Sequence, residues 1–174
     1  MYEIQIRSAV LDDAEALVTL LNPIIEAGTT ALDTMLTIAG ERDYIASLHE
    51  RAIFLVAALA LDGTLVGCQS VEPFTTTGTH AFDHVGVMGT WGAAGHQRRG
   101  IGRRLFEAMF EQARRKGYEK IFTYVRADNA AGMAAYVGQG FRVIGTAERH
   151  AKIDGRYIDE VLIERFLSGC DLMR

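Results

Sequence analysis

Alternation of apolar and polar positions begins near the amino terminus. Over residues 2–8 the apolar side chains fall at every second position, which is typical of a half-buried strand. The next apolar residues recur at helical spacing, with Asp12 or Asp13 as the expected N-cap and Gly28 as the expected end. Pro23 inside this run is expected to bend or split the helix.

Two apolar runs flank a tight turn in the next part of the chain. The runs IFLVAALA and TLVGCQSV surround Leu61-Asp62-Gly63, and an Asp-Gly pair suits a hairpin turn. The sequence therefore predicts two adjacent antiparallel strands, preceded by a helix over about 41–51. The small polar stretch 74–80 is expected to be a loop.

Strands and helices alternate in the second half of the chain. The apolar spacing predicts a strand at about 82–91, a helix at 100–116, a strand at 120–126, a helix at 129–139, and strands at 141–147 and 156–166. This order implies an α/β (α+β) fold with a mixed, partly parallel central sheet flanked by helices. Five aromatic residues are assigned to its core: Phe54, Phe106, Phe110, Phe141 and Phe166.

Composition narrows the class of protein. A chain of 174 residues is expected to form a single domain over 1–174. The net charge of -4 has the wrong sign for a protein that binds nucleic acid through its phosphates. Two distant cysteines give neither a disulfide framework nor a metal site, and no stretch resembles a signal peptide or a membrane span. We expect a cytoplasmic protein without metal, nucleic-acid or membrane partners.

One segment carries a candidate anion site. The sequence Gly-His-Gln-Arg-Arg-Gly-Ile-Gly leads into the helix at 100–116, so free backbone N–H groups and the positive end of a helix dipole meet there. Glycines at helix starts are also ordinary turn residues, so this pattern alone leaves both interpretations open. A dinucleotide-binding motif would need glycine at Leu105, and a P-loop would need Gly-Lys-Ser/Thr where Gly102-Arg103-Arg104 stands, so both are excluded.

The motif instead resembles the signature of the GNAT acetyltransferases. HQRRGIGRRL is similar to their Gln/Arg-x-x-Gly-x-Gly/Ala loop, and NAAGMAAYVGQGF is similar to their later Asn…Tyr…Gly-Phe segment. IQIRSAVLDDAEAL resembles the family's first strand and helix, and IDGRYIDEVLIERFL its last strand. The resemblance implies the GNAT acyl-CoA N-acyltransferase fold and an N-acetyltransferase that uses acetyl-CoA as co-substrate.

The resemblance also implies which residues hold the coenzyme. In the loop, the pyrophosphate would be held by Gln97, Arg98, Arg99, Gly100, Ile101, Gly102 and Arg103. The pantetheine arm would pair along the strand with the main chain of Met88, Gly89, Thr90 and Trp91. Asn129 would contact the coenzyme while also capping its helix. The many glycines of this strand have a second explanation, which is a β-bulge without a ligand.

Tyr136 is the candidate general acid. Asn129, Met133 and Tyr136 share one face of their helix, which turns the phenol toward the coenzyme. Amine attack on a thioester expels a thiolate whose conjugate acid has a pKa of about 8.5, and a phenol with a pKa of about 10 can donate a proton to it. The alternative for Tyr136 is an ordinary core aromatic residue.

The acceptor side is less defined. Glu72 and Asp83 are the candidate bases for the amine, His80 and His84 are weaker candidates, and a chain of waters could replace them all. Glu72, Phe74 and Trp91 are expected to line the acceptor pocket.

NPIIEAGTTALDT resembles the family branch that acetylates small amines such as phosphinothricin or methionine sulfoximine, which makes a small-molecule primary amine the expected acceptor. The alternatives are a protein or peptide amine and a non-catalytic acyl-CoA-binding module. Family resemblance also suggests a homodimer.

Overall fold

The computed structural model describes residues 3–74 and 78–167. Tyr2 of the first expected strand and positions 75–77 of the expected loop lie outside these ranges. Within them the elements follow one another as β1 (Ile4–Ser8), a 3-10 turn (Leu11–Asp13), α1 (Ala14–Glu26), α2 (Ile38–Ser47), β2 (Ile53–Leu59), β3 (Leu65–Pro73), β4 (Val85–Gly92), α3 (Ile101–Arg115), β5 (Lys120–Arg126), α4 (Ala130–Val137), β6 (Arg142–Ile153) and β7 (Arg156–Phe166).

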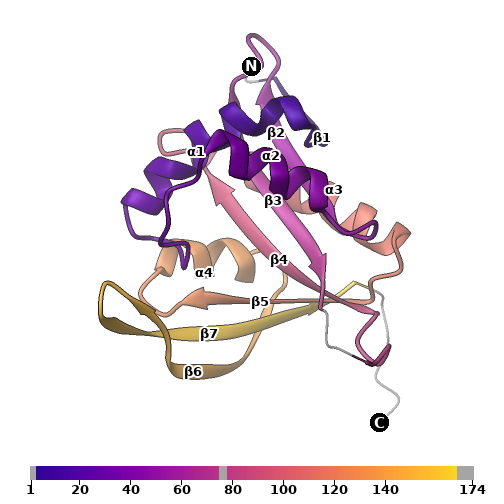
Figure 1. Cartoon of the computed structure of the whole chain (residues 1–174). Coiled ribbons are helices and arrows are strands. Elements are labelled where there is room, and N and C mark those ends of the chain that lie inside the picture. Colours follow the sequence, from indigo (N-terminus) through magenta and orange to yellow (C-terminus); the bar gives the residue numbers. More distant parts are fainter. Residues whose placement is uncertain (1–2, 75–77, 168–174) are drawn as a thin grey trace.

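The strands form a seven-stranded sheet in the order β1-β2-β3-β4-β5-β7-β6 (Figure 1). β4 and β5 run parallel and are connected through α3, whereas the other neighbouring strands run antiparallel. The prediction of a mixed, partly parallel sheet is confirmed.

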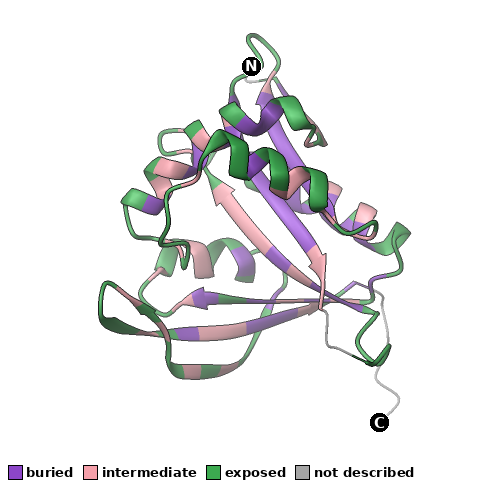
Figure 2. Ribbon diagram, viewed as in Figure 1, coloured by how far each residue is buried: buried purple, intermediate pink, exposed green. Residues whose placement is uncertain are grey.

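Helices cover the sheet unequally. On one face, α3 and α4 pack side chains such as Phe106, Met109 and Tyr136 into a hydrophobic cluster with the strands. On the other face, Leu17 and Leu21 of α1 pack on β2 and β3, with α2 beside them. In Figure 1, α1 and α2 lie in front of β2 and β3, while no helix of the described chain lies in front of β5, β7 and β6. Burial follows this unequal cover: in Figure 2, buried residues run along β2 and β3, whereas β6 has none.

One predicted helix cap and one predicted helix start differ from the structure. Asp13 is the N-cap residue of α1, as predicted, but its carboxylate makes no capping hydrogen bond, because it accepts from both Arg7 terminal nitrogens, at 2.6 and 2.7 Å, and from the Val10 amide at 2.8 Å. α1 continues through Pro23 to Glu26. The second helix begins three residues earlier than predicted because Thr37 caps it, accepting from the Gly40 amide.

The other differences concern ends of elements and one core residue. β4 begins at Val85 rather than near 82, and β6 runs on to Ile153 through two register shifts against β7. Phe54, Phe106, Phe110 and Phe141 are buried as predicted, but the assignment of Phe166 is wrong, since it is 42% exposed. Its ring is contacted by the Lys120 and Arg142 side chains, so it serves as a surface cation–π partner.

Candidate active site

The glycine-rich loop that leads into α3 has three residues in the left-handed region, of which the first is Gly95. Gly100 has φ +78°, which glycine adopts at no steric cost, and Arg98 has φ +59°. Gly102 has ordinary helical geometry, and a Cβ built on it would meet no protein atom within 4 Å. Neither backbone strain nor packing within the chain therefore requires glycine at position 102.

The predicted loop residues divide by what their side chains do. Ile101 is 6% exposed and packs into the core, so it can offer a ligand only its main chain. The Arg103 guanidinium donates to Glu107 at 2.7 Å, and Arg104 donates to the carbonyl of Ile4 at 2.9 Å. The remaining predicted loop residues, Gln97, Arg98, Arg99, Gly100 and Gly102, are exposed.

β4 and β5 separate halfway along their length. Their parallel pairing stops at Val87 and Phe122, and the Met88 carbonyl then accepts a hydrogen bond from the Thr123 hydroxyl at 2.6 Å. Main-chain groups of alternate strand residues point to the same edge, so those of Thr90 follow Met88 toward β5. Within the described ranges, Thr90 has no strand partner on that edge. The gap leaves a length of β4 main chain available for pairing with a ligand.

Tyr136 of α4 reaches this gap. Its side chain is buried against Phe106 and Phe141, with ring centroids 5.4 and 5.0 Å away, and its hydroxyl donates to the Thr90 Oγ1 at 3.0 Å. Burial raises the pKa of Tyr136 to about 12. The interpretation of Tyr136 as a core aromatic residue is confirmed, and its protonated hydroxyl lies at the β4 edge, but its role as general acid stays a prediction.

Asn129 caps α4. Its Oδ1 accepts from the Gly132 amide at 2.8 Å, and its Nδ2 donates to the Thr29 carbonyl at 3.0 Å. The predicted capping role is thus confirmed, and the same side chain ties α4 to the segment between α1 and α2. Its predicted contact with the coenzyme stays a prediction.

Trp91 explains one glycine of β4. A Cβ built on Gly89 would lie 2.1 Å from the Trp91 ring, so the indole lies directly over that residue. The Trp91 Nε1 donates to Thr30 Oγ1 at 3.4 Å, which places the indole beneath the segment between α1 and α2. Glycine at position 89 is therefore required by packing against Trp91, whereas a Cβ on Gly92 would meet nothing within 4 Å.

Glu72 lies near the end of β3 on the α2 side of the sheet. It accepts a hydrogen bond from the Tyr44 hydroxyl at 2.7 Å. Burial, followed by the interaction with Glu72, raises the pKa of the Tyr44 phenol, which keeps it a donor. Glu41, one turn before Tyr44 on α2, is buried, and its Oε1 has no hydrogen-bond partner among residues 3–74 and 78–167; burial raises the pKa of its carboxyl.

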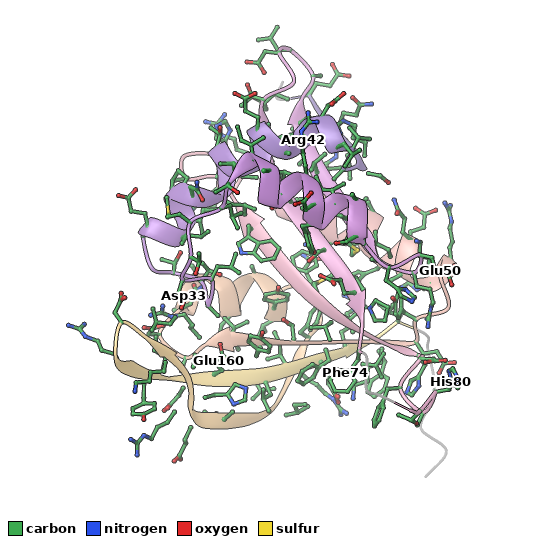
Figure 3. All side chains as sticks on the ribbon, viewed as in Figure 1. Asp33, Arg42, Glu50, Phe74, His80 and Glu160 are labelled. Carbon is green, nitrogen blue, oxygen red and sulfur yellow. The ribbon has the colours of Figure 1, made fainter. Side chains whose placement is uncertain are left out.

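The other candidate bases lie at the surface before β4. His80 and Asp83 pair with each other at 3.1 Å, and the His80 side chain is almost fully exposed (Figure 3). The Asp83 carbonyl also accepts from Arg51 at 2.6 Å. His80 and Asp83 therefore bind each other at the surface, and their contacts within the described chain do not point to a role in catalysis. Of the candidate bases, Glu72 lies nearer the gap, because it is opposite Val87 in the sheet.

Sequence comparison identifies the family. The profile of the acetyltransferase (GNAT) family matches residues 23–141, and the chain belongs to this family. The N-alpha-acetyltransferase RimI of Mycobacterium tuberculosis is 33% identical over 93 residues, which are 53% of this chain. That match spans 55% of the length of RimI.

Solved structures agree with this assignment. A GNAT-family acetyltransferase from Streptococcus pneumoniae is 28% identical, with a TM-score of 0.80 and coverage of 95% of this chain and 100% of that one. The phosphinothricin acetyltransferase of Sinorhizobium meliloti in complex with acetyl-CoA has a TM-score of 0.85 at 16% identity, covering 98% and 92% of the two chains. The protein therefore has the GNAT fold. No helix in the described ranges is long and apolar enough to cross a membrane.

The sequence predicts no side-chain role in the site for four polar residues near it. Thr90 was expected to act only through its main chain, yet its hydroxyl bonds Tyr136 and also accepts from Gln69. The sequence patterns likewise assign no role in the site to Tyr44, Thr123 or Glu41. The position of these polar groups at the site depends on residues that are distant in the sequence, so no local sequence pattern predicts it.

Proposed function

We propose that this protein transfers the acetyl group of acetyl-CoA to the primary amine of a small molecule. The observation that carries the proposal is the β4 edge beyond Val87, which has no strand partner in the described chain and is faced by the Tyr136 hydroxyl. A phosphorylated, amide-bearing cosubstrate suits this arrangement, because amides can pair along a strand edge and phosphates bind helix N-termini.

The chain fits acetyl-CoA at both places. At the α3 N-terminus, the amides from Gln97 to Gly102 would hold the pyrophosphate, and the open space over Gly102 admits its close approach. Arg98 and Arg99 are exposed beside these amides and would add positive charge. Along β4, the main chain from Met88 to Trp91 would pair with the pantetheine arm.

Tyr136 would act as the general acid. In the reaction the amine nitrogen forms a bond to the acetyl carbon, the carbon–sulfur bond breaks, and the leaving sulfur takes up a proton. A phenol whose pKa is about 12 stays protonated at neutral pH and can supply that proton to a thiolate whose conjugate acid has a pKa of about 8.5. The Thr90 hydroxyl fixes the position of the phenol, and bulk solvent restores the proton.

Glu72 would remove the proton from the acceptor amine. It lies on the α2 side of the sheet, whereas Tyr136 lies on the α4 side, so acid and base would approach the gap from opposite faces. The hydrogen bond from Tyr44 holds the carboxylate in one orientation. Phe74 and Trp91 would form walls of the acceptor site on the same side.

A small acceptor is favoured by the segment between α1 and α2. Thr29 and Thr30 in this segment accept hydrogen bonds from Asn129, Arg126 and Trp91, which ties the segment down across the ends of β4 and β5. A protein substrate would need an open groove there. An amino acid or an analogue such as phosphinothricin or methionine sulfoximine is therefore a candidate. We further propose that the protein is a single-domain, cytoplasmic homodimer. Sedimentation of the purified protein tests the dimer.

A second candidate acceptor is the N-terminal amine of a peptide. The partial match to the N-alpha-acetyltransferase RimI favours it. The two candidates share the donor site and differ only in the acceptor.

Thiol release from acetyl-CoA in the presence of amines tests the proposal. We expect a panel of small primary amines to stimulate release, and the Tyr136→Phe variant to lose most of that stimulation. Stimulation by peptides alone would favour the second candidate. Tight binding of acetyl-CoA without turnover on any amine or peptide would instead indicate a binding module and overturn the proposal.

A further inference from the structure

A strip of aromatic side chains lies beside the proposed acceptor site. The Phe74 ring meets Phe82 at 5.4 Å and Phe122 at 6.2 Å, both edge to face, and Tyr124 follows Phe122 two residues later on the same side of β5. We call these four residues the aromatic strip. None of them belongs to either hydrophobic core, and Phe82 and Tyr124 are 41% and 43% exposed. Clustered exposed aromatic rings are a feature of binding surfaces.

Register ties the strip to the transfer point. Glu72 of β3 is opposite Val87 of β4, and Val87 is opposite Phe122 of β5, so the three side chains share one face of the sheet. Neighbouring strands lie about 4.8 Å apart, which puts Phe122 about 10 Å from Glu72 across the sheet. β4 and β5 separate just beyond this row, so the strip begins where the gap opens.

Three cations on this face, Lys120, Arg142 and Arg126, are each paired with a carboxylate. Lys120 and Arg142 both bond the carboxylate of Glu164. Arg126 bonds the Asp128 carboxylate at 2.7 Å. An acidic group on the acceptor would have to share these cations with carboxylates that already offset much of their charge.

A buried carboxyl group, Glu160, lies on the same face and also disfavours an acid. Glu160 of β7 is 2% exposed. It is opposite Arg126 in the register of β5 and β7, so the two side chains lie on the same side of the sheet. One of its oxygens lies 3.9 Å from His150, and the other has no hydrogen-bond partner among the described residues. Glu72 and Glu160 are both carboxyl groups on this face, so an acidic group of the acceptor would gain no favourable contact from either of them.

We infer that the acceptor is a primary amine with an aromatic body and no acidic group. Its amine would lie at the gap near Glu72, and its ring would lie on the aromatic strip. This inference rests on the proposed function and deepens it, because it selects one chemical class among small amines. It separates this chain from enzymes that act on acid-bearing amines such as phosphinothricin.

Three amines test the inference in the thiol-release assay. 2-Phenylethylamine has the proposed chemistry, L-phenylalanine adds only a carboxylate to it, and phosphinothricin bears two acidic groups without a ring. We expect kcat/KM for 2-phenylethylamine to exceed that for each of the others by about tenfold or more, as unfavourable burial of one unpaired charge implies. A preference for phosphinothricin or L-phenylalanine would overturn the inference while leaving the proposed function intact. Failure of every amine to stimulate release would instead remove the proposed function.

Substitutions in the strip give a second test. Phe122→Ala should lower kcat/KM for 2-phenylethylamine by about tenfold or more, mainly through KM, because a buried aromatic contact is lost. Phe122→Leu should recover part of that loss. Phe166→Ala removes an exposed ring whose contacts are Lys120 and Arg142, and it should change nothing. Binding of acetyl-CoA, followed by thermal shift, should be unchanged in all three variants. Equal activity of Phe122→Ala and wild type on this amine would contradict the inference.

Discussion

Replacing Tyr136 by Phe isolates one hydroxyl group. The ring keeps its contacts with Phe106 and Phe141, and only the hydrogen bond to Thr90 Oγ1 is lost. One such bond contributes about 1 kcal/mol to stability, so the variant should fold with a slightly lower free energy of unfolding. If the phenol protonates the leaving sulfur, kcat should fall about 100- to 10,000-fold, the usual contribution of a general acid. This corresponds to about 3–5 kcal/mol in the activation barrier.

Tyr118 offers a matched control. It is also buried, its hydroxyl also donates one hydrogen bond, to the Arg51 carbonyl at 3.1 Å, and burial raises its pKa to about 12 as well. Tyr118→Phe should therefore cost similar stability and leave kcat unchanged. Thiol release at saturating acetyl-CoA and amine measures both variants. Equal kcat for Tyr136→Phe and wild type, or an equal loss in Tyr118→Phe, would refute the acid role.

The pH dependence of the wild type adds a further check. Because the pKa of Tyr136 is raised to about 12, its protonated form persists throughout the neutral and mildly alkaline range. Deprotonation of Tyr136 should therefore not lower kcat between about pH 7 and pH 10. A decline in that range that disappears in Tyr136→Phe would place the phenol's pKa lower and contradict this account of its environment.

Three other substitutions test separate parts of the site and the fold. If Glu72 is the base, Glu72→Gln should lower kcat/KM by about 100-fold or more, and Tyr44→Phe should lower it less. Unchanged pH–rate profiles in both variants would show that Glu72 is not the base. Gly102→Val should raise KM for acetyl-CoA about tenfold or more, because the new side chain fills the space over the loop. Gly145→Val also adds a side chain in open space and should leave this KM unchanged. Equal KM values for the two variants would contradict a pyrophosphate site at the loop. Burial raises the pKa of Glu41, so its contribution to stability is lost as pH rises above the unfolded value of about 4.3. Glu41→Gln should be more stable than wild type by about 1 kcal/mol near pH 8, with the difference shrinking toward pH 5, as urea unfolding would show.

Local chemistry made much of the fold predictable. The run from Lys120 to Arg126 was predicted with its observed bounds, because alternation and flanking turns mark a strand strongly. The second helix was placed several residues too late, because Thr37 supplies a cap that lies outside the apolar repeat. Phe166 was misassigned because an aromatic residue in a strand is as compatible with a cation–π contact at the surface as with the core.

The candidate site was predictable only in part. The glycine-rich turn could be predicted from local sequence, because a residue with a positive φ, such as Gly100, is usually glycine. Gly89, by contrast, looked like a site of ligand approach, and only the structure attributes it to the Trp91 ring. The contacts of Glu72 with Tyr44 and of Tyr136 with Thr90 join residues that are 28 and 46 positions apart. Such contacts depend on strand order and register, which sequence patterns do not specify.

The separation of β4 and β5 beyond Val87 has an evolutionary consequence. If the donor is held through main-chain groups, mutations of strand side chains leave its affinity almost untouched. The side chains on the face that carries Phe122 and Glu72 are then free to vary with the acceptor. Selection could thus exchange one amine for another in small steps, without ever passing through a protein that had lost its acetyl donor.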